Sequence, residues 1–318
     1  MRLIYPENIE DIALGAAVLG NGGGGDSYIG KLLSIAAISK HGPVHLVSPA
    51  EISDDCLIAI SAMMGAPTVT VEKLPKGTEG VDAFLALQTY LERTIDYTTS
   101  AEIGGLNSTL PFAVAAYLRI PVVDADEVGR AAAPIAISDE KGNASIIDAM
   151  DKHWTERLAR TICTEMGATA MIAAYPMTGR QLKESMVPGT LTRAERIGQH
   201  IRQARQQHQI SIEALREVTD GFELFRGKVT EVPLYSENGF TRSVVTLQGT
   251  DGWAGSHMTL SFQDEHLQAV RDGKVVTSVA DRISVLDAET AEPVTTHGWR
   301  YGLRVVILAI PRLAETSE

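Results

Sequence analysis

In the first third of the chain, segments with the apolar periodicity of helices are interrupted by glycines. Across residues 7–19, apolar side chains recur every three to four positions, which predicts a helix that Gly20 ends. Asp26 stands where the N-cap of a second helix is expected, and this helix should reach about Ser39. A third amphipathic helix is predicted over residues 79–97.

Short apolar runs predict strands between and after these helices. Residues 56–62 form a continuous apolar run, which is typical of a strand that is buried on both faces. The other strands of this region are predicted at 44–47, 98–101 and 121–123. A further helix is predicted over 109–118. Because strands alternate with helices, we expect an α/β domain with a mainly parallel sheet over residues 1–190.

The pattern changes after this region. Thr192 and Glu195 have the spacing of a capping box, which predicts a helix from Thr192 to about Gln209. A second short helix is predicted to begin at Ser211. Residues 191–220 are therefore expected to form a helical connection.

The last third of the sequence has the pattern of a β-rich domain. Short apolar runs are separated by Gly, Asp and Asn turns, and they predict strands at 227–232, 241–249, 257–263, 274–279, 282–286 and 303–309. We therefore expect a second, smaller β-rich domain over residues 221–318.

Charge and cysteine content narrow the class of protein. The net charge of −12 argues against nucleic acid or an anionic membrane as the main partner. The sequence has no apolar run long enough to span a membrane, and its first residues turn acidic before a signal-peptide core could form. Cys56 and Cys163 cannot form a disulfide framework, and both are expected to pack in the core. We expect a cytoplasmic homo-oligomer that acts on a small molecule.

Four consecutive glycines are the most unusual local feature. They lie in the glycine run Asn21, Gly22, Gly23, Gly24, Gly25 and Asp26. In one interpretation, backbone N–H groups of this run line a concave site at a helix start and bind the oxygens of a ligand. In the other, the run is a tight corner between helices whose glycines adopt positive φ angles. The first interpretation makes all six residues substrate-binding candidates.

Acidic side chains follow two of the predicted strands. Glu102 follows one strand, and Asp124 and Asp126 follow another. Ligands of open α/β sheets bind beyond the carboxyl ends of strands, so we predict these three carboxylates as catalytic residues. They could act as acid and base or bind a divalent metal. The alternative is that Asp124 and Asp126 cap the next turn and pair with Arg130.

A second glycine-rich turn lies beside these acidic residues. Gly104 and Gly105 precede Asn107 at the start of a predicted helix. The N–H groups of this turn and the Asn107 amide could bind an anion or a carbonyl oxygen. In the alternative interpretation, Asn107 or Ser108 caps the helix.

Polar residues elsewhere complete the predicted binding site. Gln263 and Glu265 end a predicted strand of the β-rich domain and either face the site or form a solvated turn. Arg130 follows the second acidic strand end. We predict all three as substrate-binding residues.

Several segments together resemble one protein family. They are Leu19–Asp26, Glu102–Asn107, Pro121–Asp126, Gly129–Ala131, Leu224–Val229, Phe262–Glu265 and Arg300–Val305. In this order they resemble the S-methyl-thiohydantoin desulfurase-like family, long known as a domain associated with hydantoinase and oxoprolinase systems. The resemblance covers nearly the whole chain and implies an α/β domain followed by a smaller β-rich domain.

The resemblance also implies an activity. The family's named reaction removes the methylthio group from a thiohydantoin ring, so we expect hydrolytic displacement on a small ring substrate. Glu102, Asp124 or Asp126 would activate the water, with or without a metal. The alternative is a non-catalytic partner or metabolite-binding subunit of an ATP-dependent hydantoinase or oxoprolinase complex. A third hypothesis, motivated by the glycine run, is a phosphate- or nucleotide-binding protein.

Overall fold

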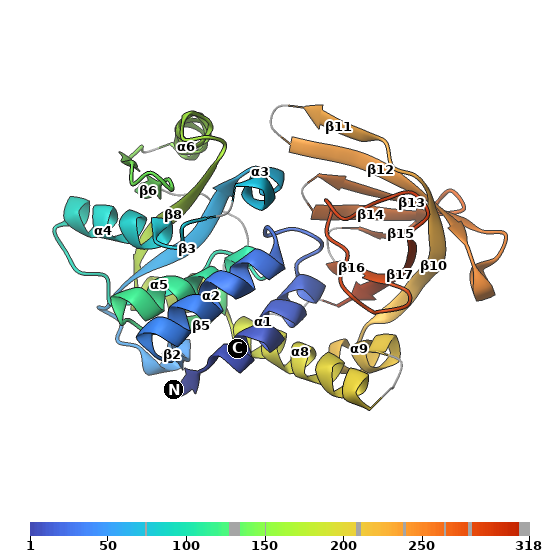
Figure 1. Ribbon diagram of the computed structural model, residues 1–318, viewed down its shortest axis with the longest axis horizontal. Helices are drawn as coiled ribbons and strands as arrows, with labels where there is room; N and C mark the ends of the chain where they lie inside the picture. The colour runs from blue at the N-terminus through green and yellow to red at the C-terminus, as the bar shows by residue number, and fades with distance from the viewer. Residues whose placement is uncertain are drawn as a thin grey trace. The chain divides into compact units, whose positions relative to one another are not determined.

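The protein consists of two compact units (Figure 1). The computed structural model describes residues 1–73, 75–126, 134–149, 151–207, 211–237, 240–263, 265–278 and 282–311. Unit 1 comprises Met1–Ala13 and Gly24–Glu195, and unit 2 comprises Leu14–Gly23 and Arg196–Glu318. Each unit contains its own sheet.

Unit 1 is built on sheet A. Its strands are β1 (Arg2–Ile4), β2 (Val44–Val47), β3 (Leu57–Gly65), β4 (Tyr97–Ser100), β5 (Val122–Asp126), β6 (Ile135–Ser138), β7 (Ala144–Ile147), β8 (Thr169–Thr178) and β9 (Val187–Pro188). They follow the order β1-β2-β5-β4-β3-β8-β6-β7, and β9 pairs with β5. The strands β2, β5, β4 and β3 are parallel, whereas the other pairs are antiparallel. The α/β prediction is confirmed, but the sheet is mixed rather than mainly parallel.

Strand β8 accounts for this difference. It lies between β3 and β6 and is antiparallel to both. Its buried side chains include Ala170, Ala173 and Ala174. Because alanine is depleted in strands, the local pattern gave no strand signal here. Packing between two neighbouring strands therefore determines the conformation of this segment.

Helices cover both faces of sheet A. The larger helices are α2 (Ser27–His41), α4 (Glu79–Leu91), α5 (Leu110–Leu118) and α6 (Lys152–Glu165), and the shorter ones are α3 (Pro67–Glu72), α7 (Gly179–Ser185), η1 (Pro49–Glu51) and η2 (Leu106–Ser108). In β3, Ala59 packs in one cluster with Phe84 of α4, whereas Ile60 packs in another with Leu182 of α7. The prediction of a strand buried on both faces is therefore confirmed.

The first two helices agree with the sequence pattern. They are α1 (Pro6–Leu19) and α2, and Asp26 is the N-cap of α2. The Asp26 Oδ1 atom accepts a hydrogen bond from the Ile29 amide at 2.9 Å. Within the described ranges, every helix is too short or too polar to cross a membrane.

The predicted helix over 79–97 is too long. Helix α4 ends at Leu91, because Glu92 adopts a left-handed conformation with φ of 50°. Ile95 is 1% exposed and donates its amide to Gln88 Oε1 at 2.8 Å. A buried residue in the following turn therefore continued the apolar periodicity past the end of the helix.

The predicted capping box at Thr192 and Glu195 is wrong. Helix α8 spans Thr190–Gln206 and begins before Thr192. The Glu195 carboxylate accepts a hydrogen bond from Asn8 Nδ2 at 2.8 Å and pairs with Arg2. The Glu195 side chain therefore bonds to residues that are distant in sequence and does not complete a capping box.

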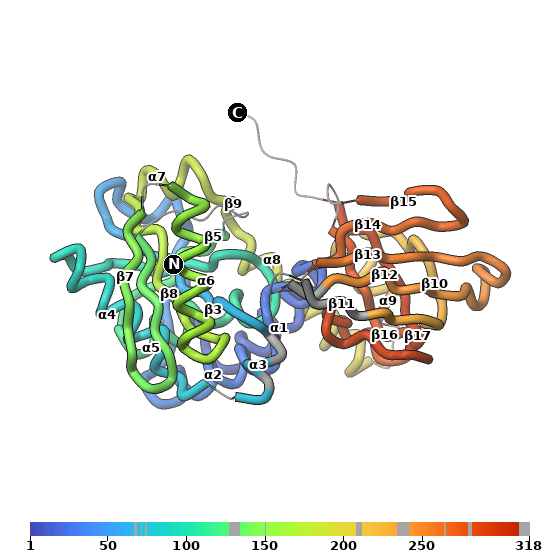
Figure 2. The backbone as a smooth tube through the Cα atoms, turned by 90° about the horizontal axis from the view of Figure 1, so that it is seen from above, coloured from blue at the N-terminus to red at the C-terminus, as the bar shows by residue number. Residues whose placement is uncertain are grey.

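Unit 2 is built on the antiparallel sheet B (Figure 2). Its strands are β10 (Phe222–Glu231), β11 (Leu234–Glu237), β12 (Phe240–Gly249), β13 (His257–Gln263), β14 (Glu265–Arg271), β15 (Lys274–Ser278), β16 (Arg282–Asp287) and β17 (Arg304–Ile310). They follow the order β15-β14-β13-β12-β10-β17-β16, and β11 pairs with β12. Unit 2 also contains α9 (Ser211–Thr219) and η3 (Asp251–Trp253). The prediction of a β-rich part is confirmed.

One apolar cluster forms the core of unit 2. Phe225 of β10, Leu247 of β12, Phe262 of β13 and Ile307 of β17 are all at most 2% exposed. Trp299 packs in the same cluster from the segment before β17. Burial of these side chains supplies most of the driving force for folding of this sheet.

Candidate functional site

The carboxyl ends of β3, β4 and β5 lie at one edge of sheet A, because these strands are parallel and adjacent. The loop after β4 carries Glu102 and leads into η2, and Asp126 is the last residue of β5. This edge is where ligands bind in open α/β sheets. We therefore regard the loop of residues 101–108 as the centre of the candidate site.

Asp126 fixes this loop to the sheet. Its side chain is 2% exposed, and its Oδ2 atom accepts a hydrogen bond from the Ile103 amide at 2.8 Å. The Ser100 hydroxyl donates to the Glu102 carbonyl at 2.7 Å and lies 3.0 Å from the Asn107 carbonyl. The backbone around Glu102 is thus tied to the ends of β4 and β5.

Asn107 orients the Glu102 carboxylate. The Asn107 Oδ1 atom accepts a hydrogen bond from the Met63 amide of β3 at 2.8 Å. Because Oδ1 is an acceptor, the Nδ2 group is the donor, and it lies 3.0 Å from Glu102 Oε1. Asn107 is 7% exposed, whereas Glu102 is half-buried. The Asn107 amide therefore orients a carboxylate that is not fully buried.

The predicted cap of the following helix is wrong. The N-cap of α5 is Thr109, which makes no side-chain capping bond. Asn107 bonds to Met63 and Glu102, and the Ser108 hydroxyl accepts from the Gly104 amide at 2.8 Å. Both side chains stabilise the 101–108 loop instead of the helix.

Asp124 caps a helix that is distant in sequence. Its Oδ1 atom accepts hydrogen bonds from the amides of Leu191 and Thr192 at 2.9 and 3.2 Å. Its Oδ2 atom accepts a hydrogen bond from the Thr192 hydroxyl. These groups lie in the first turn of α8, where backbone N–H groups lack helical partners and a negative charge is favourable. The two aspartates of β5 thus hold different segments.

The two glycine-rich turns pack directly against each other. The Asn107 amide donates to the Gly24 carbonyl at 3.1 Å. A Cβ atom at Gly105 would lie 1.9 Å from the Gly25 oxygen, and one at Gly24 would lie 2.5 Å from the Gly104 backbone. Gly24 and Gly25 also have φ angles of 79° and 82°. Close backbone approach and positive φ together explain these glycines.

The first half of the glycine run belongs to unit 2. The Asn21 carbonyl accepts a hydrogen bond from the His266 amide at 2.8 Å, and the Gly22 carbonyl accepts one from the Thr296 amide at 3.1 Å. Asn21 and Gly22 have φ angles of 51° and 80°. Gly23 donates its amide to the Gly20 carbonyl at 2.8 Å. The run is therefore held at both of its ends.

His266 is a functional candidate that the sequence pattern did not indicate. Its side chain is 1% exposed. Burial lowers its pKa from 6.5 to about 4, although the hydrogen bond to the Ile283 carbonyl opposes this shift. The sequence offered no signal, because His266 lies in an alternating strand and its partners come from distant segments.

The remaining predicted residues have simpler settings. Arg130 lies outside the described residues. Gln263 and Glu265 are opposite each other where β13 pairs with β14, and both are half-buried. Cys163 is 3% exposed, and burial raises the pKa of its thiol, which suits a packing residue.

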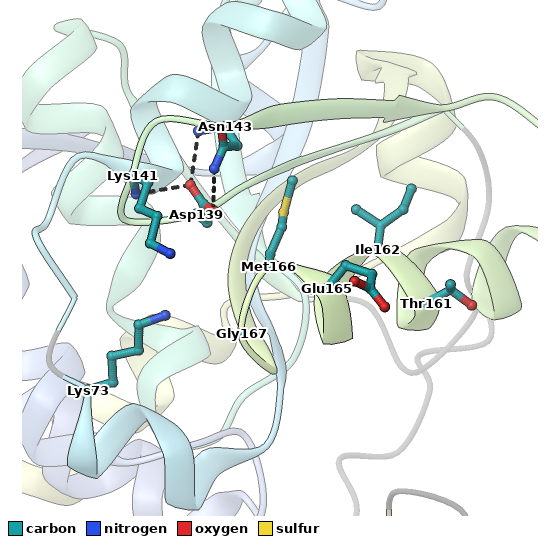
Figure 3. A pocket seen from close by; sticks show the side chains of 9 residues that line it. All are labelled: Lys73, Asp139, Lys141, Asn143, Thr161, Ile162, Glu165, Met166 and Gly167. Atoms are coloured by element: carbon teal, nitrogen blue, oxygen red, sulfur yellow. Dashed lines mark hydrogen bonds between the residues drawn. The ribbon is translucent and has the colours of Figure 1, made fainter.

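A surface pocket lies elsewhere at the carboxyl edge of sheet A (Figure 3). Its volume is about 350 Å³, and none of the predicted catalytic residues lines it. Lys73 pairs with Glu140 at 2.6 Å. Burial opposes ionisation of Asp139, but hydrogen bonds from Asn143 and Lys141 outweigh it and lower the pKa of this carboxyl. Because none of the predicted catalytic residues lines it, this pocket is not our candidate site.

Metal ligation was one of the alternatives for the acidic residues. In the part of the chain that the structure describes, no group of three or more His, Cys, Asp or Glu side chains could hold a metal ion. The hydrogen bonds of Asp124 and Asp126 go to backbone amides of different segments. The geometry thus favours interpreting them as anchors of the backbone.

Comparison with known proteins identifies the family. Residues 7–149 match the model of the S-Me-THD-like N-terminal domain, and residues 150–316 match the model of the S-Me-THD-like C-terminal domain. This chain belongs to the S-Me-THD-like family. The resemblance to S-methyl-thiohydantoin desulfurase-like proteins is thereby confirmed.

A solved structure shares the fold. It is an X-ray crystal structure of a protein from Chromobacterium violaceum, with 24% sequence identity and a TM-score of 0.78. The match covers 100% of this chain and 94% of that chain. The search of curated proteins gave no match. This likeness supports the fold alone. The chemistry has to be inferred from the residues of the site.

Replacement of Gly105 by alanine should destabilise the protein strongly. The new Cβ atom would clash with the Gly25 carbonyl, so we expect the free energy of unfolding to fall by about 3 kcal/mol or more in urea denaturation. Gly142→Ala is the matched control, because Gly142 has φ of 84° but no neighbour within 4 Å. It should cost only about 1 kcal/mol. Equal losses in both variants would contradict the close approach.

Asp124→Ala should act on stability through the cap of α8. Loss of the bonds to Leu191 and Thr192 should lower the free energy of unfolding by about 2 kcal/mol. Asp124→Asn should cost less, because an amide oxygen can still accept from the two backbone amides. Thermal and urea denaturation measure both variants. Wild-type stability of Asp124→Ala with complete loss of activity would instead make Asp124 a catalytic residue.

The buried His266 should make the protein less stable in mild acid. The unfolded imidazole binds a proton near pH 6.5 and the folded one only near pH 4, so the free energy of unfolding falls as pH drops through this window. The full loss is about 3 kcal/mol, since one pKa unit corresponds to about 1.4 kcal/mol. Urea denaturation between pH 7 and 4 should show a flatter profile for His266→Phe. Parallel profiles would show that another group is responsible.

Proposed function

We propose that this protein removes the sulfur substituent of a small thiohydantoin-like ring by hydrolytic displacement and that Glu102 is the general base. The observation that carries the proposal is the setting of the Glu102 carboxylate. It is half-buried at the carboxyl edge of sheet A and oriented by the Asn107 amide. Membership of the S-Me-THD-like family supports the choice of substrate class.

The proposed reaction displaces a methylthio group by water. Glu102 accepts a proton from water while the water oxygen bonds to the ring carbon that carries the sulfur. The carbon–sulfur bond then breaks, and the sulfur leaves with the proton returned by Glu102 as methanethiol. The second proton of the water is lost as the new carbonyl group forms and is taken up by the ring nitrogen. The products are a hydantoin and methanethiol, and no oxidant or reductant is needed.

Asn107 supports this step indirectly. Its amide oxygen is fixed by the Met63 amide, so its Nδ2 group can hold the Glu102 carboxylate in one orientation. A general base must lie within hydrogen-bond reach of the proton that it removes, so a fixed orientation favours the reaction. We assign Asn107 as a positioning residue and the backbone of the two glycine-rich turns as the surface that holds the ring oxygens.

Asp126 and Asp124 act on the backbone in this proposal. Asp126 holds the Ile103 amide next to Glu102, whereas Asp124 holds the start of α8. Both hydrogen-bond to backbone amides, which leaves Glu102 as the carboxylate best placed to meet a substrate. The three predicted catalytic residues therefore have three different roles.

Glu102→Gln should abolish catalysis without loss of stability. The amide keeps the size of the side chain but cannot take a proton, so we expect methanethiol release from an S-methyl-thiohydantoin to fall at least about 100-fold. The unfolding midpoint should stay within error of the wild type. Release is measured with a thiol reagent, with and without a chelator.

The matched control is Glu165→Gln. Glu165 is an exposed carboxylate at the end of α6 and is not part of the 101–108 loop, and this variant should keep the wild-type rate. Full activity of Glu102→Gln would remove Glu102 from the mechanism. No release by folded wild-type protein would overturn the proposed function. Release that a chelator stops would mean that Glu102 acts on a metal-bound water, and release that survives it assigns activation to the carboxylate alone.

A further inference from the structure

Strand β4 carries three successive hydroxyl side chains that are shielded from water. Thr98, Thr99 and Ser100 are each 0% exposed, so each hydroxyl needs a hydrogen-bond partner inside the protein. The Thr98 hydroxyl lies 2.7 Å from that of Ser61 in β3, and the Thr99 hydroxyl donates to two carbonyls of β5. The first two hydroxyls therefore bind neighbouring strands, whereas Ser100 bonds to the loop that follows its own strand.

The Ser100 hydroxyl contacts both the candidate base and the residue that orients it. It donates to the Glu102 carbonyl at 2.7 Å and to the Asn107 carbonyl at 3.0 Å, so its one hydrogen is shared between two acceptors. The side chains of the same two residues meet at 3.0 Å, where Asn107 Nδ2 donates to Glu102 Oε1. One buried hydroxyl thus holds the two backbones whose side chains form this bond.

Other contacts of the 101–108 loop each hold a single point. The Asp126 carboxylate accepts from the Ile103 amide at 2.8 Å, and the Gly24 carbonyl accepts from the Asn107 amide at 3.1 Å. Ser100 differs because it bonds to residues near both ends of the loop. It therefore limits how far these ends can separate.

Loss of this hydroxyl should move the Glu102 carboxylate. The carbonyls of Glu102 and Asn107 would lose a donor that comes from a fully buried side chain. Because a buried acceptor without a donor is costly, the loop would be stabilised by turning these carbonyls toward other partners. A small displacement of a general base reduces the rate strongly, since proton transfer depends on geometry.

We propose that Ser100 is a positioning residue that holds the backbones of Glu102 and Asn107 together and thereby orients the Glu102 carboxylate for the reaction. The part that concerns catalysis rests on the proposed function. Ser100 is fully buried and does not touch the substrate in this proposal. Its effect passes through Glu102.

The matched control for Ser100→Ala is Ser61→Ala. Ser61 and Ser100 are opposite each other where β3 pairs with β4, and both are 0% exposed. Ser61 bonds to the Thr98 hydroxyl and not to the 101–108 loop. The two variants thus remove the same atom from equally buried positions, and only one of them releases the loop.

Hydrogen exchange at pH 7 tests the hold on the loop directly. The Gly104 amide donates to the Ser108 hydroxyl at 2.8 Å, and the Ser108 amide donates to the Gly104 carbonyl at 3.2 Å. Both amides should exchange at least about tenfold faster in Ser100→Ala than in Ser61→Ala. Equal exchange in the two variants would overturn the positioning role, because Ser100 would then be an ordinary buried hydroxyl.

A milder pair of variants decides the question if Ser100→Ala does not fold. Ser100→Cys keeps a similar shape and a weak donor, and Ser61→Cys is its control. The amides of Gly104 and Ser108 should still exchange faster in Ser100→Cys than in Ser61→Cys. The absence of any difference would overturn the proposal in the same way.

Kinetics test the catalytic part separately. With an S-methyl-thiohydantoin, kcat/KM should fall at least about tenfold in Ser100→Ala and less than about threefold in Ser61→Ala. Faster loop exchange in Ser100→Ala with unchanged kcat/KM would overturn the link between Ser100 and the reaction. If the folded wild type releases no methanethiol, the proposed function fails, and the exchange comparison alone decides whether Ser100 holds the loop.

A double variant tests whether the effect passes through the carboxylate. In the Glu102→Gln background, Ser100→Ala should lower the residual rate less than about twofold, because the group that Ser100 positions is already lost. A loss of about tenfold in both backgrounds would overturn the route through Glu102, since the two changes would then act independently.

Discussion

The close approach of two glycine-rich turns is the constraint on which the candidate site depends. A side chain at Gly105 would overlap the Gly25 carbonyl, and one at Gly24 would overlap the backbone of Gly104. Because these backbones touch, the Gly24 carbonyl can accept from Asn107, the residue that orients Glu102. Glycines that are far apart in the sequence thus allow the two turns to touch. The candidate site depends on this contact, because Asn107 takes part in it and orients Glu102.

The side chains of Glu102, Asp124 and Asp126 all end in a carboxylate, but these carboxylates differ in their hydrogen-bond partners. Asp126 binds the Ile103 amide and Asp124 binds the first turn of α8, so both stabilise backbone that would otherwise lack partners. Glu102 accepts from a side-chain amide and is half-buried. A general base needs both a fixed orientation and access to the proton that it removes, and Glu102 combines them. This difference motivates its role in the proposed hydrolysis.

Local patterns in the sequence predicted the features that depend on near neighbours. The cap by Asp26 and the fully buried strand β3 are of this kind. Glu102 and Asn107 were also recognised as candidates, but their mutual hydrogen bond was not. The partner of Asp124 lies 67 residues away, and the ring of His266 meets Gly22 only through the tertiary fold. The periodicity of the sequence cannot predict such contacts, because they depend on how distant segments pack.

Water as the nucleophile is the central claim of the proposed mechanism. If water displaces the methylthio group, its oxygen must become the new carbonyl oxygen of the ring. The most direct measurement is mass spectrometry of the hydantoin formed in H₂¹⁸O, with exchange of the isolated product as a blank. We expect one ¹⁸O atom in the enzymatic product beyond the blank. A hydantoin that forms enzymatically without ¹⁸O would contradict it, because the ring carbon would then have been attacked by another nucleophile.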